Sequence, residues 1–67
     1  MAMTPKAARI NVGLTQNEAS KALGISKGTL SAYESGKTIP KLDVAIKMAK
    51  LYGCSMEDLN FLPEDCA

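Results

Sequence analysis

The sequence predicts an all-α protein, a compact bundle of four or five short helices. Its 67 residues include five glycines and three prolines, which divide the chain into segments of two or three helical turns. No segment shows the alternation of apolar and polar residues that is typical of a half-buried strand. A chain of this length forms one domain at most, so a large catalytic cleft is not expected.

The first two helices are marked by residues that favour helix ends. Thr4 precedes Pro5, which suits a first helical position because its missing N–H needs no partner there. Gly13 suits a left-handed stop. Thr15 and Glu18 have the spacing of a capping box, in which each side chain binds the backbone N–H of the other residue. These signals predict helices over about 5–12 and 16–23.

The later helices follow the same logic. Ser26 can cap a third helix, which Gly36 stops. Pro40 marks a loop, after which apolar residues recur on one helical face: Leu42, Ala45, Met48, Ala49 and Tyr52. Ser55 precedes Asp58 by three residues and can cap a last short turn. The prediction is helices over about 27–35 and 42–52, one domain over 5–60, and a short C-terminal tail over 61–67.

Residues 16–35 have the pattern of a helix-turn-helix, in which two helices cross steeply at a turn of three or four residues. Gly24 can supply the left-handed turn residue, and Ser20 is small enough for a close approach of the two helices. Apolar side chains occupy the inward positions: Ala19, Leu23, Ile25, Leu30 and Tyr33. The joint occurrence of these features in one window makes the motif specific.

Basic residues gather in the first part of the chain, although the net charge is only +1. Residues 1–50 carry all eight Lys and Arg and three acidic residues, whereas residues 51–67 carry four acidic residues and no basic one. Attraction to a polyanion depends on local potential, so this asymmetry is typical of a module that binds nucleic acid with one face. Chance is the alternative explanation in so short a chain.

Several other classes of protein are not expected. The chain has no His, and its two cysteines, Cys54 and Cys66, are isolated from each other and too few for a disulfide scaffold. No group of residues has the pattern of a metal, nucleotide or nucleophile site, so we predict no enzyme activity, metal or cofactor. No apolar run approaches the roughly 20 residues of a membrane span. We therefore expect a cytoplasmic protein.

Short pieces along the chain are similar to a known family: Arg9, Gly13-Leu14-Thr15-Gln16, Leu23-Gly24-Ile25-Ser26, Tyr33-Glu34-Ser35-Gly36-Lys37, Pro40, and Ala49-Lys50-Leu51-Tyr52-Gly53-Cys54-Ser55. From about residue 6 to 59, the sequence resembles the Cro/C1-type helix-turn-helix regulators of phages and bacteria. The resemblance implies a lambda-repressor-like fold with the third helix in the DNA major groove. It also implies a structural ion pair between Arg9 and Glu34 and a phosphate contact by Gln16. Without it, these residues would be two solvated charges and a polar first-turn residue.

A DNA-binding role assigns functions to residues in and around the third helix. Its buried positions leave one face for base reading: Lys27, Gly28, Thr29, Ser31 and Ala32. Phosphate contacts are expected from Gln16, Ser26, Lys37 and Thr38, with Lys6 and Lys41 as weaker candidates. The base-reading face has no Arg, Asn or Gln for bidentate contacts. Specificity is therefore either modest or based on DNA shape, with Gly28 permitting close approach of the backbone.

The expected partner is double-stranded DNA, with no membrane partner. The resemblance implies a homodimer on half-sites about one helical turn apart. Apolar residues near the C-terminus either form the dimer surface or cap the core: Met56, Leu59, Phe61 and Leu62. The predicted function is a sequence-specific transcriptional regulator acting as a repressor. Two alternatives use the same fold, namely an antitoxin that binds a toxin and a protein-interaction adaptor with weak DNA binding.

Overall fold

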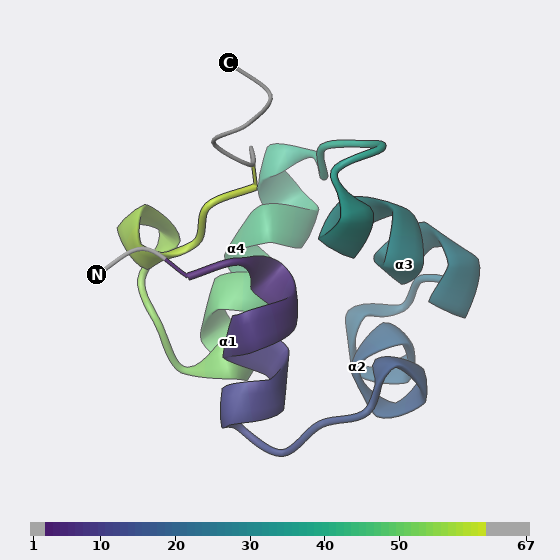
Figure 1. Cartoon of the computed structure of the whole chain (residues 1–67), viewed down its shortest axis with the longest axis horizontal. Helices are drawn as coiled ribbons and strands as arrows, with labels where there is room; N and C mark the ends of the chain where they lie inside the picture. The colour runs from purple at the N-terminus through teal and green to yellow at the C-terminus, as the bar shows by residue number, and fades with distance from the viewer. Residues whose placement is uncertain (1–2, 62–67) are drawn as a thin grey trace.

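The computed structural model describes residues 3–61 as short helices joined by loops (Figure 1). The elements are α1 (Pro5–Asn11), α2 (Gln16–Leu23), α3 (Lys27–Ser35), α4 (Leu42–Tyr52) and a 3-10 turn, η1 (Met56–Asp58). The all-α prediction is confirmed, and the bounds of α2, α3 and α4 are those predicted. α1 ends one residue earlier than predicted because Val12 leaves the helical conformation and becomes the C-cap. No helix within residues 3–61 is long and apolar enough to cross a membrane.

The first three helices each begin at a residue whose side chain caps the helix. At α1 this residue is Thr4. At α2 the Thr15 hydroxyl accepts from the Glu18 N–H at 3.1 Å, and the Glu18 carboxylate accepts from the Thr15 N–H at 2.9 Å. Hydrogen bonds with Thr15 lower the pKa of the Glu18 carboxylate, and the bond with the Thr15 N–H has a larger effect than the bond with its hydroxyl. At α3 the Ser26 hydroxyl accepts from the Thr29 N–H at 3.1 Å. Each of the polar residues that predicted these helices therefore binds one of the N–H groups that a helix start leaves unpaired.

The turn between α2 and α3 depends on the conformation of one glycine. Gly24 has a φ of +72°, which residues with a side chain rarely adopt. A Cβ added there would meet nothing within 4 Å, so backbone conformation rather than space favours glycine. The neighbouring Ile25 N–H donates to the Ser20 carbonyl at 3.0 Å, and the buried Ser20 hydroxyl donates to the Asn17 carbonyl at 3.0 Å. The turn thus satisfies its own polar groups.

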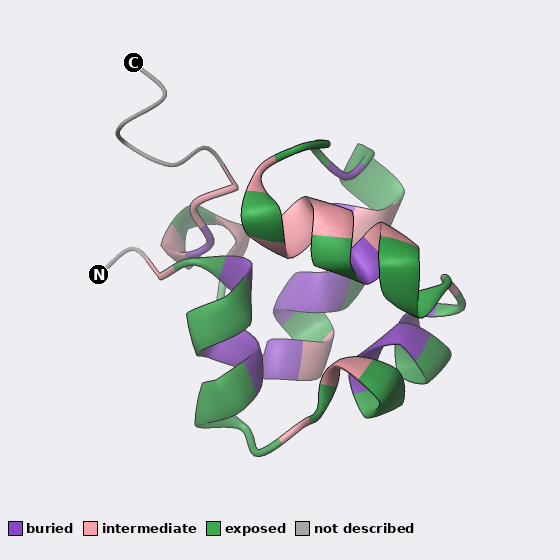
Figure 2. Cartoon of the chain, turned by 45° about the vertical axis from the view of Figure 1, so that its right-hand side comes forward, coloured by how far each residue is buried: buried purple, intermediate pink, exposed green. Residues whose placement is uncertain are grey.

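The core lies where the helices meet, and Figure 2 shows buried residues on their inward faces. α4 packs against α1, α2 and η1, while α3 packs against α1 and α2. The buried cluster consists of Ala8, Ala19, Leu23, Leu30, Met48, Ala49, Tyr52 and Leu59. Leu42 was predicted on this inward face but is 69% exposed. It is the first residue of α4, at the edge of the apolar stripe, and no element within residues 3–61 covers it.

The C-terminal apolar residues that the structure describes pack against the core. Leu59 is 6% exposed and forms an isolated parallel bridge with Met3. Met56 and Phe61 are partly buried against the same cluster, and Leu62 lies outside the described residues. The prediction of a dimer surface is therefore wrong for Leu59, because its side chain belongs to the core. Capping of the core, the alternative, describes Leu59, Met56 and Phe61.

One polar group is buried in this core. Tyr52 is 3% exposed, and its hydroxyl has no hydrogen-bond partner within residues 3–61. Burial raises the pKa of Tyr52 to about 12, and the carboxylate of Glu34 contributes in the same direction. The folded chain disfavours the phenolate form of Tyr52. The stability that the folded state gains from keeping Tyr52 neutral is therefore fully present below the ordinary pKa of 10 and is lost as the pH rises through about 12.

We expect Tyr52→Phe to raise the free energy of unfolding at neutral pH by about 1 to 3 kcal/mol, because it removes a buried hydroxyl without a partner. The variant should also lose less stability than the wild type between pH 10 and about 12. Urea denaturation followed by circular dichroism at neutral and alkaline pH measures both effects. A clear loss of stability at neutral pH would contradict this expectation.

Candidate nucleic-acid interface

Arg9 and Glu34 form an ion pair between α1 and α3. Arg9 Nε lies 2.7 Å from Glu34 Oε2, and Arg9 Nη2 donates to Glu34 Oε1 at 3.4 Å. The third guanidinium nitrogen, Nη1, donates to the Leu14 carbonyl at 2.7 Å. The two side chains are only 9% and 4% exposed. Arg9 therefore ties α1 to α3 and to the loop before α2.

The same carboxylate also holds the start of α2. Gln16 Nε2 donates to Glu34 Oε1 at 2.9 Å, so one oxygen of Glu34 accepts from both Gln16 and Arg9. Gln16 is the first residue of α2, and Glu34 is the next-to-last residue of α3. The orientation of the Gln16 side chain is thus coupled to the ion pair.

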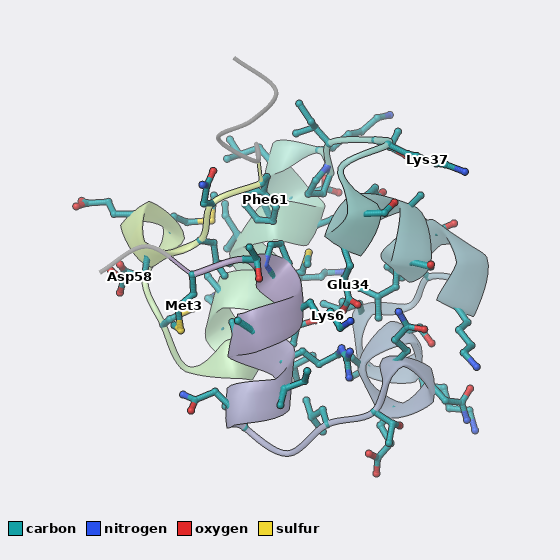
Figure 3. All side chains as sticks on the ribbon, viewed as in Figure 1. Met3, Lys6, Glu34, Lys37, Asp58 and Phe61 are labelled. Carbon is teal, nitrogen blue, oxygen red and sulfur yellow. The ribbon has the colours of Figure 1, made fainter. Side chains whose placement is uncertain are left out.

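Two adjacent hollows lie where α1, the start of α2 and α3 meet, and we refer to them together as the interhelix groove. The larger hollow, of about 470 Å³, is lined by Lys6, Arg9, Thr15, Gln16, Asn17 and Lys27. The smaller, of about 160 Å³, is lined by Lys6, Gln16, Ser31, Glu34 and Ser35. Figure 3 shows Lys6 and Glu34 close together near the middle of the molecule. Of the three cations in the groove, Arg9 is neutralised by Glu34, so the positive charge comes from Lys6 and Lys27.

The predicted base-reading residues lie along the outward part of α3. Lys27, Gly28 and Ser31 are exposed, whereas Thr29 and Ala32 are half-buried. The Thr29 hydroxyl is 2.8 Å from the hydroxyl of the cap residue Ser26, so it also serves the helix start. Of this set, Lys27 and Ser31 also line the interhelix groove.

The predicted phosphate contacts fall at both ends of α3. Gln16 lies in the groove and Ser26 is exposed at the start of α3. Lys37 and Thr38 are exposed in the loop after α3, where their N–H groups donate to the Ala32 carbonyl at 3.0 and 3.4 Å. In Figure 3 Lys37 points outward, well away from Lys6. The fold therefore separates these residues into two groups that flank α3. Lys41 is exposed at the start of α4.

Two residues of the groove were weak candidates or absent from the predicted set. Lys6 was a weak candidate, yet it lines both hollows. Its signal was the spacing of three residues from Arg9, which puts both side chains on one side of α1. Asn17 was not singled out, although it follows Gln16 at the start of α2 and lines the larger hollow.

The described residues offer groups that bind anions. The groove presents ammonium, amide and hydroxyl groups. Within residues 3–61, no three His, Cys, Asp or Glu side chains gather closely enough to hold a metal ion. Cys54 is half-buried against the core, and burial raises the pKa of its thiol.

Comparison with known proteins agrees with this geometry. A helix-turn-helix family model matches residues 6–59. An uncharacterized HTH-type transcriptional regulator of Methanocaldococcus jannaschii is 46% identical over 52 residues, which are 78% of this chain and 77% of the relative. The cryptic phage CTXphi transcriptional repressor RstR of Vibrio cholerae is 39% identical over 51 residues, 76% of this chain and 46% of that protein. An uncharacterized HTH-type transcriptional regulator of Bacillus subtilis is 32% identical over 60 residues, 90% of this chain and 91% of the relative. No solved structure matches the chain.

We expect Arg9→Met to lower the free energy of unfolding by about 3 to 5 kcal/mol, because the carboxylate of Glu34 is left buried without its charged partner. The double variant Arg9→Met with Glu34→Leu should recover much of this loss, since neither charge is then buried. Urea denaturation of the wild type, both single variants and the double variant gives the coupling energy. Lys47→Ala, at an exposed charge on α4, is the control and should change stability by less than about 0.5 kcal/mol. Strictly additive losses would rule out the coupling.

Proposed function

The chain belongs to the Cro/C1-type helix-turn-helix family of DNA-binding transcriptional regulators, and from this premise we propose that it is a sequence-specific repressor that binds DNA as a homodimer. The DNA-binding unit extends over residues 5–60, with the motif at 16–35, and α3 enters the major groove. The observation that carries this proposal is the interhelix groove, whose cationic and amide groups lie beside the exposed side of α3. The name of the related V. cholerae protein, a phage transcriptional repressor, supports repression over activation.

Phosphate binding fixes the orientation of α3 on the DNA. One N–H of the Gln16 amide is held by Glu34, which leaves the second N–H for a phosphate oxygen. The helix start at Gln16 adds unpaired backbone N–H groups, and Lys6 and Lys27 add positive charge beside it. Ser26 at the start of α3, and Lys37 and Thr38 after its end, flank this helix and contact the DNA backbone on either side of it. The Arg9–Glu34 pair acts through Gln16 as a positioning element.

Base reading falls to the outward side chains of α3. Lys27 donates to guanine O6 and N7, and Ser31 makes a shorter hydrogen bond to a base edge. The methyl groups of Thr29 and Ala32 contact thymine methyl groups. Because these side chains are few and short, DNA shape and deformability contribute to the preference.

Gly28 contributes to DNA binding because it has no side chain. Gly28 is exposed, it has no positive φ, and a Cβ added there would meet only the Ser26 hydroxyl at 4.0 Å. The fold therefore does not require glycine at this position, where alanine would favour the helix by roughly 1 kcal/mol. Close approach of the α3 backbone to DNA accounts for the glycine.

Selection of bound sequences from a random pool of duplex DNA tests the proposed function. We expect enrichment of a palindrome with half-sites about 34 Å apart, since two copies present their α3 helices together. Affinity should also fall steeply with salt, because phosphate contacts release counterions. No enrichment together with salt-insensitive binding would contradict the proposal and favour the adaptor alternative. Isolation with a bound toxin would instead favour the antitoxin.

The same selection, repeated with Lys27→Ala and Lys37→Ala, separates the two roles. Lys27→Ala should change the preferred base at one position of each half-site, by about 1 to 3 kcal/mol. Lys37→Ala should weaken all sequences alike and reduce the salt dependence. Identical behaviour of the two variants would disprove the assignment of a base contact to Lys27.

We expect Gly28→Ala to have opposite effects on folding and on DNA binding. Thermal denaturation should show a gain of up to about 1 kcal/mol, because alanine stabilises a helix relative to glycine. Fluorescence anisotropy with the selected duplex should show weaker binding, because the added methyl group keeps the α3 backbone away from the DNA. Asn11→Ala, at an exposed position of α1 that does not line the interhelix groove, is the control and should bind like the wild type. Unchanged or tighter binding by Gly28→Ala would refute the role given to Gly28.

A further inference from the structure

We infer that two copies of the chain dimerise through the outward side of the first half of α4 and the loop before it. We call this surface, formed by Ile39, Leu42 and Ile46, the α4 face. The inference rests on the proposed function, in which the repressor acts as a dimer. It assigns the dimer contact to a surface other than the C-terminal residues, of which Leu59 belongs to the core.

The α4 face consists of three exposed apolar residues that fall within residues 39–46. Leu42 is 69%, Ile39 55% and Ile46 39% exposed. Leu42 and Ile46 are one helical turn apart on α4, and Ile39 immediately precedes the buried Pro40, which anchors the loop. In Figure 2 a mostly exposed loop leads from the end of α3 to the exposed start of α4. Single exposed apolar residues are common on proteins, whereas a cluster marks a surface that binds a partner.

The charges around the α4 face fit a second copy of the same chain. Asp43 lies three residues before Ile46 and Lys50 lies four residues after it, and both are exposed. These spacings put the acid and the base on the same side of α4 as Ile46. When two α4 helices run antiparallel with the Ile46 side chains at a two-fold axis, Asp43 of each copy faces Lys50 of the other. The face thus carries both halves of its own ion pair, as an isologous interface requires.

A dimer of this kind suits the proposed DNA binding. The α4 face begins in the loop that directly follows α3, so pairing through it sets the spacing between the two α3 helices. A fixed spacing lets the second α3 helix bind its half-site as an intramolecular event, which increases the affinity for the whole site without new base contacts. This gain in affinity is important because the side chains of α3 offer few base contacts.

Ile46→Glu tests the inference most directly, because it places two like charges next to each other at the two-fold axis. Sedimentation equilibrium of the full chain without DNA, over a wide range of concentrations, gives the dimer dissociation constant. We expect the wild type to dimerise and Ile46→Glu to raise this constant by at least about tenfold, equivalent to about 1.4 kcal/mol. Ile10→Glu is the matched control, because Ile10 is 56% exposed on α1, outside the α4 face, and it should dimerise like the wild type. Circular dichroism establishes that both variants fold.

A charge exchange provides a second measurement that does not depend on the apolar contact. Asp43→Lys and Lys50→Asp should each weaken the dimer, because each places like charges opposite one another. The double variant should return the dissociation constant to within about threefold of the wild type, which a loss of folding would not allow. Additive weakening in the double variant would overturn the antiparallel pairing.

The outcomes separate this inference from the proposed function. A wild type that stays monomeric at all concentrations, or an Ile46→Glu variant that dimerises like it, overturns the inference. Intramolecular covering of the face by residues 62–67 would give the first of these results. If the selection enriches a palindrome while Ile46→Glu still dimerises normally, the proposed function stands and the α4 face is wrong. If the α4 face forms the dimer but no DNA sequence is enriched, the inference stands and the proposed function is wrong.

Discussion

The carboxylate of Glu34 is the point on which the arrangement of the first three helices depends. It accepts from Arg9 of α1 and from Gln16 at the start of α2, while belonging to α3 itself. The remaining guanidinium nitrogen of Arg9 binds the loop carbonyl of Leu14, so the connection from α1 to α2 is held as well. A buried ion pair gives little net stability, because desolvation offsets the attraction. We therefore regard the pair as a device that fixes geometry, and the geometry it fixes is that of the interhelix groove.

Basic and acidic residues, which are separated along the sequence, are also found in different places on the folded chain. Lys6 and Lys27 line the groove, whereas Asp58 lies in η1, on the opposite side of the molecule from Lys37 (Figure 3). The Ser55 hydroxyl and N–H lower the pKa of Asp58, so its carboxylate stays charged. A net charge of +1 thus conceals a local difference, with two lysines at the groove and two acidic residues in η1. Binding to a polyanion depends on local positive charge of this kind.

The packing of the helices explains how so short a chain can leave one side of α3 exposed. Leu30 is fully buried and anchors α3 in the core, while the outward side of α3 carries small side chains apart from Lys27. Small buried residues such as Ala8, Ala19 and Ala49 let the helices approach closely. One copy offers few side chains for base contacts, which gives the proposed dimerisation through the α4 face its importance.

Local physics allowed the sequence by itself to determine the helices, the turn and the motif. Side-chain caps and left-handed glycines act within about four residues, so they predicted α2 and α3 with the bounds that the structure has. The bounds of α4, whose start has no side-chain cap, followed from Pro40, the apolar periodicity and Gly53. The Arg9–Glu34 pair spans 25 positions and was expected only from a family resemblance. Tertiary structure alone decided which apolar residues find partners. Leu59, expected either at a dimer surface or over the core, is buried, and Leu42, expected in the core, is exposed. Helical periodicity gives the direction of a side chain, whereas burial depends on which distant segment packs against it.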